Sequence, residues 1–298
     1  MTEGIILLDK PTGQTSFQSL GELKRRLATL RVGHAGTLDR FAEGLLVVLA
    51  GRMTRLCSFA TSLDKEYLAV FAFGRGTDTL DPEGAETAQG PVPSRRDVEE
   101  VLPSFTGTIS QVPPQYSAVH VGGKRAYQAA RAGESPVLAP RSVTIETLDL
   151  LDFVGAHLTL RISCSKGTYV RSLARDMAAR LGTCAFVSAL RRTRIGGFRL
   201  SDAVRAESFD PGRDLLPPGR FFDATPGLGR LTVREVRAGQ LSNGGRVDDE
   251  SFEESTARDG TFGAFSGSGR LLAVVERTNG AWRYAAVFPE EAVTERAP

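Results

Sequence analysis

The sequence predicts an α+β fold with a mixed sheet and a small β-rich unit near its C-terminal end. Strand-like segments outnumber helical segments and do not alternate regularly with them, which argues against a doubly wound parallel sheet. The stretch 211–226 is rich in proline and glycine, and it separates the larger segment from two short strand-like runs, 271–276 and 282–288. The chain has 298 residues, which agrees with two domains at about 150 residues each.

The N-terminal segment predicts two strands with a helix between them. Residues 5–8 form a short apolar run that ends at a proline-containing loop, which predicts a strand. Apolar residues at helical spacing predict a helix over 17–30, with Thr15 or Ser16 as its cap. The run 45–49 is continuously apolar, as expected of a buried strand.

The middle of the chain predicts further strands and short helices. Residues 67–73 are rich in aromatic and β-forming side chains and predict a strand, whereas the turn-forming residues of 78–93 predict a loop. A short helix is expected behind Ser94, over 95–102. The remaining expected elements are a helix over 124–132, paired strands over 143–152 and 158–164 with a turn at Gly155, and a helix over 168–181.

The charge of the chain is balanced overall but uneven along it. The 37 basic and 35 acidic side chains give a net charge of +2, which excludes a histone-like basic tail and a halophile-like acidic surface. Residues 161–199 hold nine basic side chains and one acid, a net charge of +8. Such a cluster predicts a polyanionic partner, and the alternative is an ordinary solvated helix face.

The sequence also excludes several common classes of protein and site. No apolar run approaches the ~20 residues of a membrane-spanning helix, and the N-terminus has no secretory signal, so we expect a cytoplasmic protein. Cys57, Cys164 and Cys184 lie too far apart for a zinc-binding motif and are expected to be reduced thiols. The three histidines lack metal-ligand spacing, and phosphate-loop, dinucleotide-binding and serine-hydrolase motifs are missing from the sequence. We therefore expect no metal site.

A glycine-rich loop over 33–44 carries the first candidate for chemistry. Gly33, Gly36 and Gly44 predict unusual backbone angles and the close approach of another group. Asp39 lies in this loop, just before a predicted strand, and a carboxylate can act as nucleophile, acid or base in glycosidic chemistry. The alternative is a turn or helix-capping aspartate, and the residue types alone do not separate the two.

Seven short motifs between residues 8 and 193 give a more specific indication. In order they are 8–16 (LDKPTGQTS), 33–39 (GHAGTLD), 65–67 (KEY) with 74–81 (GRGTDTLD), 111–118 (QVPPQYSA), 123–127 (GKRAY), 164–171 (CSKGTYVR) and 190–193 (LRRT). Read together, they resemble the TruB family of tRNA pseudouridine synthases. Each motif is weak alone, but seven in family order are difficult to obtain by chance.

The resemblance implies a domain organisation. It implies a catalytic domain of the pseudouridine synthase type over 1–222, built on a mixed, largely antiparallel sheet. A PUA-like RNA-binding domain is implied over 227–292. Five acids in seven residues begin at Asp248, and a Gly/Ser-rich segment follows, so we expect a flexible acidic and Gly-rich insertion at about 248–269.

The resemblance also implies an activity and a partner. The implied reaction isomerises a uridine in the T-loop of tRNA, at position 55, to pseudouridine, without a cofactor. The target base is flipped out of the RNA, detached from C1′ of the ribose, turned and rejoined through C5. Asp39 aligns with the family's essential aspartate, and attack on the base, attack on the sugar and elimination to a glycal all remain open as its role. The chain is expected to act as a monomer.

Further residues take implied roles from the motifs. Tyr67 and Arg171 match the active-site tyrosine and the arginine that would hold Asp39 ionised. If the segment around Tyr169 is extended, the side chains of Tyr169 and Arg171 share a face. The implied substrate contacts are His34, Tyr169 and Leu190, and the implied phosphate contacts are Lys10, Lys124, Arg191 and Arg192.

The sequence departs from the family pattern at two places. Arg40 stands after the aspartate where the family usually has proline, so the loop is less rigid or gains a phosphate contact. Phe186 and Val187 stand where the family often has His-Leu, shortly before Leu190. Neither departure touches Asp39, Tyr67 or Arg171.

Three rival functions remain at this point. A non-catalytic RNA-binding protein would use the same surface without the chemistry. A glycoside hydrolase would pair Asp39 with a second acid such as Glu43 and release free base or sugar. A uridine isomerase could instead act on another RNA.

Overall fold

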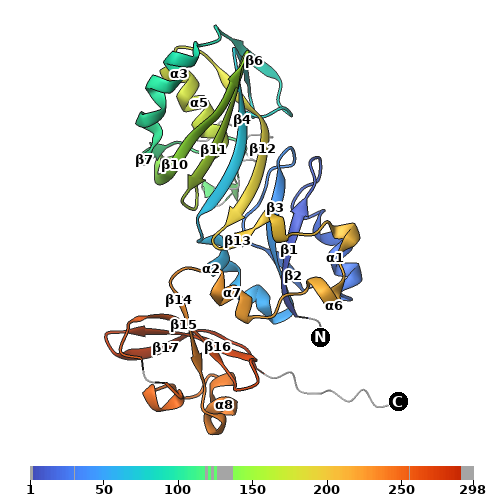
Figure 1. The fold of residues 1–298 in the computed structure, drawn as a ribbon, viewed down its shortest axis with the longest axis vertical. Helices are drawn as coiled ribbons and strands as arrows, with labels where there is room; N and C mark the ends of the chain where they lie inside the picture. The colour runs from blue at the N-terminus through green and yellow to red at the C-terminus, as the bar shows by residue number, and fades with distance from the viewer. Residues whose placement is uncertain are drawn as a thin grey trace.

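The computed structural model describes residues 3–29, 31–117, 137–254 and 256–289, together with the backbone of 120–121 and 124–125. A large sheet with helices on it is followed by a smaller four-stranded sheet, which confirms the predicted mixed α+β architecture and its β-rich C-terminal part (Figure 1). Within these residues, no helix is long and apolar enough to cross a membrane.

The large sheet contains nine strands from the first two thirds of the chain. They are β1 (Gly4–Lys10), β2 (Val32–His34), β3 (Glu43–Ala50), β4 (Lys65–Phe73), β7 (Gly107–Gln111), β10 (Arg141–Val154), β11 (His157–Cys164), β12 (Ala185–Ile195) and β13 (Phe198–Arg199). The order across the sheet is β1-β3-β12-β4-β11-β10-β7, with β2 paired to β3 and β13 paired to β12. Every pairing is antiparallel except that of β12 with β3, so the sheet is mixed and largely antiparallel.

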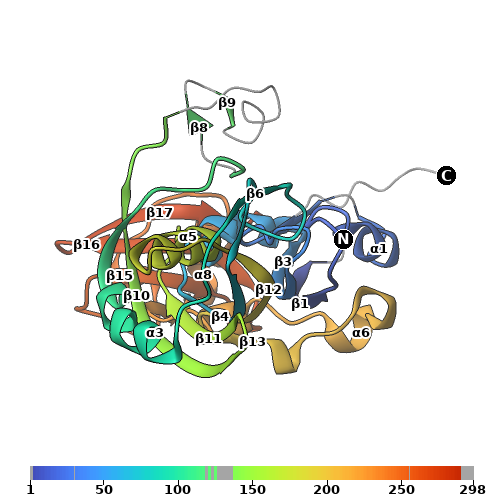
Figure 2. The ribbon, with the colours of Figure 1, turned by 90° about the horizontal axis from the view of Figure 1, so that it is seen from above.

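The helices and the small strand pairs lie outside this sheet. The α-helices are α1 (Leu20–Arg26), α2 (Cys57–Thr61), α3 (Arg95–Val101), α5 (Val170–Arg180), α6 (Pro211–Asp214), α7 (Gly219–Asp223) and α8 (Glu235–Ser242). The 3-10 turns are η1 (Gly51–Leu56), η2 (Leu102–Phe105), η3 (Leu200–Asp202), η4 (Ala206–Ser208) and η5 (Asp249–Ser251). Two short hairpins complete the fold: β5 (Arg75–Thr77) with β6 (Glu86–Gln89), and β8 (His120–Val121) with β9 (Lys124–Arg125), which lies apart from the large sheet in Figure 2.

One hydrophobic core forms where α3 and α5 cover the β4–β11–β10 part of the sheet. Leu173 and Met177 of α5 are fully buried against Phe71 of β4 and Leu160 of β11. The i, i+4 spacing places both α5 residues on one face of the helix, which explains why α5 packs here. Ser94 caps α3 through a capping box with Asp97, as the sequence predicts.

The parallel contact between β12 and β3 depends on Gly44. Arg192 of β12 is paired with Gly44 of β3, and Gly44 has a φ of +102°. A Cβ at this position would lie 2.4 Å from the carbonyl oxygen of Arg192, far inside van der Waals contact. Glycine is therefore required both for the backbone angle and for the close approach of the two strands.

The second sheet contains β14 (Leu228–Thr232), β15 (Gly260–Phe265), β16 (Leu271–Thr278) and β17 (Ala281–Val287), in that order. The expectation of a flexible insertion over 248–269 is wrong for its second half, because β15 lies between β14 and β16. Phe262 and Ala264 are buried in the core of this sheet, which fixes the segment in place. The acidic stretch is also bound: Asp248 pairs with Arg237.

The two sheets share a hydrophobic core. A chain of aromatic rings connects them, with centroid distances of 6.2 Å from Phe198 to Phe221, 5.7 Å from Phe221 to Phe222 and 5.3 Å from Phe222 to Phe265. Phe198 belongs to β13 of the large sheet, whereas Phe265 belongs to β15 of the small one. Because all four rings lie in one buried cluster, the junction between the sheets is packed like a domain interior.

Two expected helices differ from the structure, and one strand of the large sheet was not predicted. The helix expected over 17–30 is shorter, because α1 begins at Leu20 and leaves Phe17 exposed. A helix was expected over 124–132, but its first two residues form strand β9. Residues 126–136 lie outside the described part of the chain. The sequence gives no prediction of β12, although this strand lies in the middle of the large sheet.

Candidate active site

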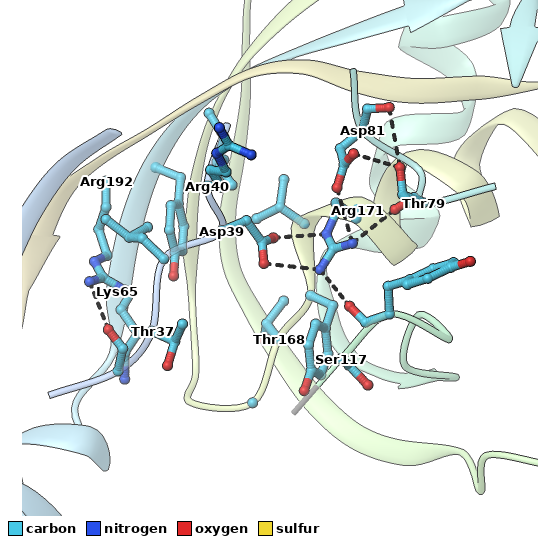
Figure 3. Close-up of a pocket in the computed structure, with 18 of the residues that line it drawn as sticks. Thr37, Asp39, Arg40, Lys65, Thr79, Asp81, Ser117, Thr168, Arg171 and Arg192 are labelled. Carbon is cyan, nitrogen blue, oxygen red and sulfur yellow. Dashed lines mark hydrogen bonds and ion pairs between the residues drawn. The ribbon is translucent and has the colours of Figure 1, made fainter. Parts of the chain in front are cut away.

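A cavity of about 1240 Å³ opens where several elements of the large sheet end. Its walls come from the loop between β2 and β3, the 78–85 loop, β4, β12 and the turn that leads into α5. Figure 3 shows Asp39 and Arg171 facing each other in this cavity, with Asp81 and Thr79 beyond the arginine.

The Asp39 loop is fixed by the segment that follows β1. The buried hydroxyl of Ser16 accepts a hydrogen bond from the Leu38 N–H at 2.9 Å and donates one to the Leu38 carbonyl at 3.1 Å. The Arg40 carbonyl accepts a hydrogen bond from the Gly13 N–H at 2.8 Å. Asp39 is therefore held between two anchored neighbours, and its carboxylate projects into the cavity from a fixed backbone.

Arg171 binds both oxygens of the Asp39 carboxylate. Its Nε lies 2.8 Å from Oδ2, and its Nη2 lies 3.1 Å from Oδ1. The guanidinium also contacts Asp81 Oδ2 at 3.2 Å and donates to the carbonyls of Thr79 and Tyr116. Arg171 is only 4% exposed, and this two-point contact fixes the orientation of the Asp39 carboxylate as well as its charge.

Two opposing influences act on the Asp39 carboxyl. Its side chain is 38% exposed toward the cavity and enclosed by protein elsewhere. This burial, with a smaller contribution from the charge of Asp81, raises the pKa of Asp39 above its ordinary value, whereas Arg171 and Lys10 act in the other direction. The result is a carboxylate that is held by a cation and is still more basic than an exposed aspartate.

Tyr67 and Arg192 form a neighbouring part of the cavity wall. They are directly opposite each other on β4 and β12. Burial raises the pKa of the Tyr67 hydroxyl, and the Arg192 guanidinium, which bonds to it, acts in the other direction. The phenol is therefore neutral at neutral pH and presents an uncharged ring to the cavity.

Leu190 and Tyr169 contribute the remaining candidate contacts. Leu190 is a buried apolar side chain of β12 that lines the cavity. Tyr169 has extended backbone just before α5, and its N–H donates to Gln111 Oε1 at 2.8 Å while Gln111 Nε2 donates to its carbonyl at 3.1 Å. Since Arg171 lies inside the first turn of α5, the condition under which Tyr169 and Arg171 would share one face of an extended segment is not met.

Comparison with known proteins places this geometry in a family. The model of the N-terminal domain of TruB family pseudouridylate synthases matches residues 24–170. The chain is 46% identical over 296 residues to tRNA pseudouridine synthase B of Borrelia garinii subsp. bavariensis, an alignment that covers 97% of this chain and 100% of the relative. The chain belongs to the TruB family of pseudouridylate synthases.

A second relative agrees with this membership, and a solved structure shares the fold. The tRNA pseudouridine synthase B of Borreliella burgdorferi (strain ZS7) is 48% identical over 211 residues, which cover 70% of this chain and 75% of the relative. The fold is similar to that in the crystal structure of a Cbf5-Nop10-Gar1 complex, with a TM-score of 0.72 and 23% identity over 97% of this chain and 84% of that one. As a TruB-family member, the chain is an isomerase of the pseudouridine synthase class.

The cavity brings together only some of the residues that the sequence singles out. Those that line it are Asp39, Tyr67, Tyr169, Arg171, Leu190 and Arg192. His34 ends β2 outside the lining, and burial lowers the pKa of its imidazole. Arg191 is also outside the lining and pairs with Glu43 at 2.7 Å. The side chain of Lys124 lies outside the described part of the chain.

Two of the expected phosphate contacts are corrected by their burial. Arg192 is 1% exposed, and its guanidinium donates to the carbonyls of Leu45 and Gly36. Lys10 is fully buried, and its Nζ donates to the carbonyls of Pro11 and Gln14. Both cations satisfy backbone groups of the loops around the site, so neither is a surface group that meets a phosphate. Burial also lowers the pKa of Lys10 to about 8.

Much of the positive charge of segment 161–199 is neutralised by ion pairs in the fold. Arg171, Arg175, Arg191 and Arg194 all pair with carboxylates, most of which lie outside this segment. The polyanion prediction therefore rests on fewer cations than the count of nine suggests.

Sequence reasoning missed Asp81 as part of the site. Asp81 is buried and binds Arg171, and although it ends the motif 74–81, the sequence assigns it no role in the site. Its neighbours Thr77 and Thr79 bond to it, and this alternation of Thr and Asp was the available signal. Among the described residues, no group of three or more His, Cys, Asp or Glu side chains is placed to hold a metal ion.

Proposed function

We propose that this chain isomerises uridine 55 in the T-loop of tRNA to pseudouridine, with Asp39 as the essential carboxylate. The observation that supports this most directly is the two-point contact of Arg171 with Asp39 beside the ring of Tyr67. The relatives are named tRNA pseudouridine synthase B, which supports tRNA as the RNA substrate.

The reaction requires an enclosed place for one flipped base. The N1–C1′ bond breaks and a C5–C1′ bond forms, while the proton lost from C5 is matched by the proton gained at N1. The substrate and product are isomers, so the balance needs neither an oxidant nor a second substrate. A base inside a helix or loop stack is out of reach of Asp39, so the uridine enters the cavity everted.

Asp39 acts as the ionised group at the sugar side of the base. Attack on the base, attack on the sugar and elimination to a glycal all need an anionic oxygen that faces the nucleoside. Arg171 orients that oxygen, and the raised pKa of Asp39 makes it a stronger base and nucleophile than an exposed aspartate.

The walls of the cavity hold the detached uracil. The neutral ring of Tyr67 stacks on the base, and Leu190 packs against it. Tyr169, which is half-buried at the cavity, contacts the sugar or base from the α5 side. These groups leave the base free to turn while they keep it from escaping. All of them come from one chain, so we propose that a monomer is active.

The proposal is tested with a tRNA T-stem-loop that carries uridine at position 55. After incubation with the purified chain, nucleoside analysis should find pseudouridine, and a substrate with cytidine at that position should give no product. The Asp39→Asn variant should bind the RNA with unchanged affinity and form no product, whereas Asp202→Asn, a change at an exposed aspartate, should keep the wild-type rate. Product from Asp39→Asn at the wild-type rate would refute the role of Asp39.

The same assay distinguishes a pseudouridine synthase from a glycoside hydrolase. That reaction would release free uracil and would need a second carboxylate near Asp39. Glu43, the candidate from the sequence, does not line the cavity and is engaged by Arg191 at 2.7 Å. We therefore expect pseudouridine without free uracil.

A further inference from the structure

The cations of the cavity fall into two groups. Lys65, Arg171 and Arg192 are buried and donate to protein carbonyls or carboxylates. These three side chains are therefore already bonded to protein groups around the site. The other lining cations, Arg40, Arg141 and Lys166, are exposed and lie at the opening.

The exposed cations are on different sides of the cavity. Arg141 begins β10 and Lys166 lies in the turn after β11, and the two segments are joined by a hydrogen bond from the Thr144 N–H to Ser165 Oγ. Arg40 instead follows Asp39 on the loop before β3. The 78–85 loop lies on the same side of the cavity as Arg40. The exposed charged side chains that it contributes there are the carboxylates Asp78 and Glu83.

The Arg40 side chain is anchored at one end and open at the other. Its Nε donates to the Gly13 carbonyl at 2.9 Å and lies 3.7 Å from Glu83 Oε1. Both interactions use Nε, so within the described part of the chain the two Nη groups keep their donors for a ligand. In Figure 3, Arg40 extends away from the Asp39 carboxylate, whereas Arg171 points at it. With the side chain 61% exposed, the ion pair with Glu83 is worth little and is easily exchanged.

We propose that Arg40 binds the phosphodiester next to the everted uridine and so positions the ribose over Asp39. This inference rests on the proposed function. If C1′ lies against the Asp39 carboxylate, a phosphate that flanks the same ribose is within one side-chain length of Arg40. On this side, Asp78 and Glu83 would repel that phosphate, and Arg40 supplies the compensating charge by exchanging Glu83 for the RNA. Arg40 is thus a positioning residue, distinct from the groups that touch the reacting atoms.

The test measures binding separately from turnover. Equilibrium affinity for the T-stem-loop is measured over a range of salt concentrations in the Asp39→Asn background, and kcat and KM are measured in the otherwise wild-type chain. Arg40→Ala should raise Kd about tenfold, because it removes a charged contact to the RNA backbone, and should also lower kcat, because the ribose is held less firmly over Asp39. It should also reduce the slope of log K against log [salt] by about 0.7 to 0.9, the value of one phosphate contact. Arg40→Lys should keep most of that slope.

Two further variants complete the design. Glu83→Gln should tighten binding a few-fold, because it removes the group that competes with the phosphate for Arg40. Arg25→Ala, a change at an arginine that is 77% exposed and lies away from the cavity, is the matched control and should leave affinity and salt slope unchanged.

An Arg40→Ala variant with an unchanged salt slope would overturn the proposal. If that variant also melts at a lower temperature, the role of Arg40 is only to stabilise the loop through its hydrogen bond to the Gly13 carbonyl. Failure of the proposed function is distinguishable, because wild-type chain would then give no pseudouridine while the binding series still reports on Arg40.

Discussion

Asp39 and Asp81 are held by one guanidinium. Arg171 makes two contacts with Asp39 and a third, at 3.2 Å, with Asp81. Asp81 therefore acts on Asp39 in two ways: it anchors the arginine that orients Asp39, and its negative charge raises the pKa of the Asp39 carboxyl. The site combines a fixed geometry with an aspartate that protonates more readily than usual.

The pH dependence of the rate should report this arrangement. In the proposed reaction Asp39 acts in its ionised form, and its raised pKa means that it takes up a proton at a higher pH than an exposed aspartate, whose pKa is about 3.9. The single-turnover rate should therefore fall on acidification with a midpoint above that value. Asp81→Asn should move the acid limb to lower pH, because the nearby charge is gone, while it lowers the maximal rate. An acid limb that moves upward in this variant would contradict the assignment.

Arg171→Lys should separate charge from geometry. Lysine keeps the positive charge but cannot bind both carboxylate oxygens and Asp81 together. We expect kcat to fall by roughly 10²- to 10³-fold with KM little changed, the size of loss seen when a positioned donor is removed. Arg175→Lys, on the same helix and paired with Asp176 at the surface, is the control and should keep near-normal kcat. Equal kinetics for the two variants would show that charge alone suffices.

Ser16→Ala should loosen the Asp39 loop without touching the substrate. The buried Ser16 hydroxyl satisfies the Leu38 N–H, and its loss leaves that donor without its partner, at a cost of about 1–3 kcal/mol in the free energy of unfolding. We expect kcat to fall while KM stays constant, measured alongside urea unfolding. Ser104→Ala removes an exposed hydroxyl and should change neither quantity. Loss of stability without loss of kcat would mean that the loop is fixed by its other contacts.

Gly44→Ala should be far more damaging than Gly155→Ala. Both glycines have positive φ, so alanine costs about 1–2 kcal/mol at either position. Only Gly44 is also crowded, by the Arg192 backbone, whereas a Cβ at Gly155 would meet open space. We expect Gly44→Ala to lower the free energy of unfolding by at least about 3 kcal/mol. Similar unfolding midpoints for the two variants would contradict the close approach of β3 and β12.

Local sequence patterns predicted much of the fold but missed β12, a strand in the middle of the large sheet. The capped helix after Ser94 and the paired strands around Gly155 follow from short-range signals, and both are present. Strand β12 was missed because its arginines mask the strand pattern, although Arg192 is buried and uses its guanidinium on backbone carbonyls. Lys10 was misplaced for the same reason: a buried cation that satisfies carbonyls cannot be distinguished in a sequence from one that meets a phosphate.

The candidate site was predicted through motifs rather than through residue chemistry. The motifs placed Asp39, Tyr67 and Arg171 on one list, and the fold brings all three to one cavity. Asp81 and Gln111 lie in the motifs 74–81 and 111–118, but their contacts with Arg171 and Tyr169 depend on tertiary packing, so the motifs alone gave neither residue a role.

The row of aromatic rings from Phe198 to Phe265 sets how the molecule can present itself to a long RNA. With its interface buried in a common interior, the C-terminal sheet cannot swing as if on a tether. The distance from any surface group of this sheet to Asp39 is therefore fixed. An RNA that contacts both the C-terminal sheet and Asp39 would therefore have to match this fixed distance.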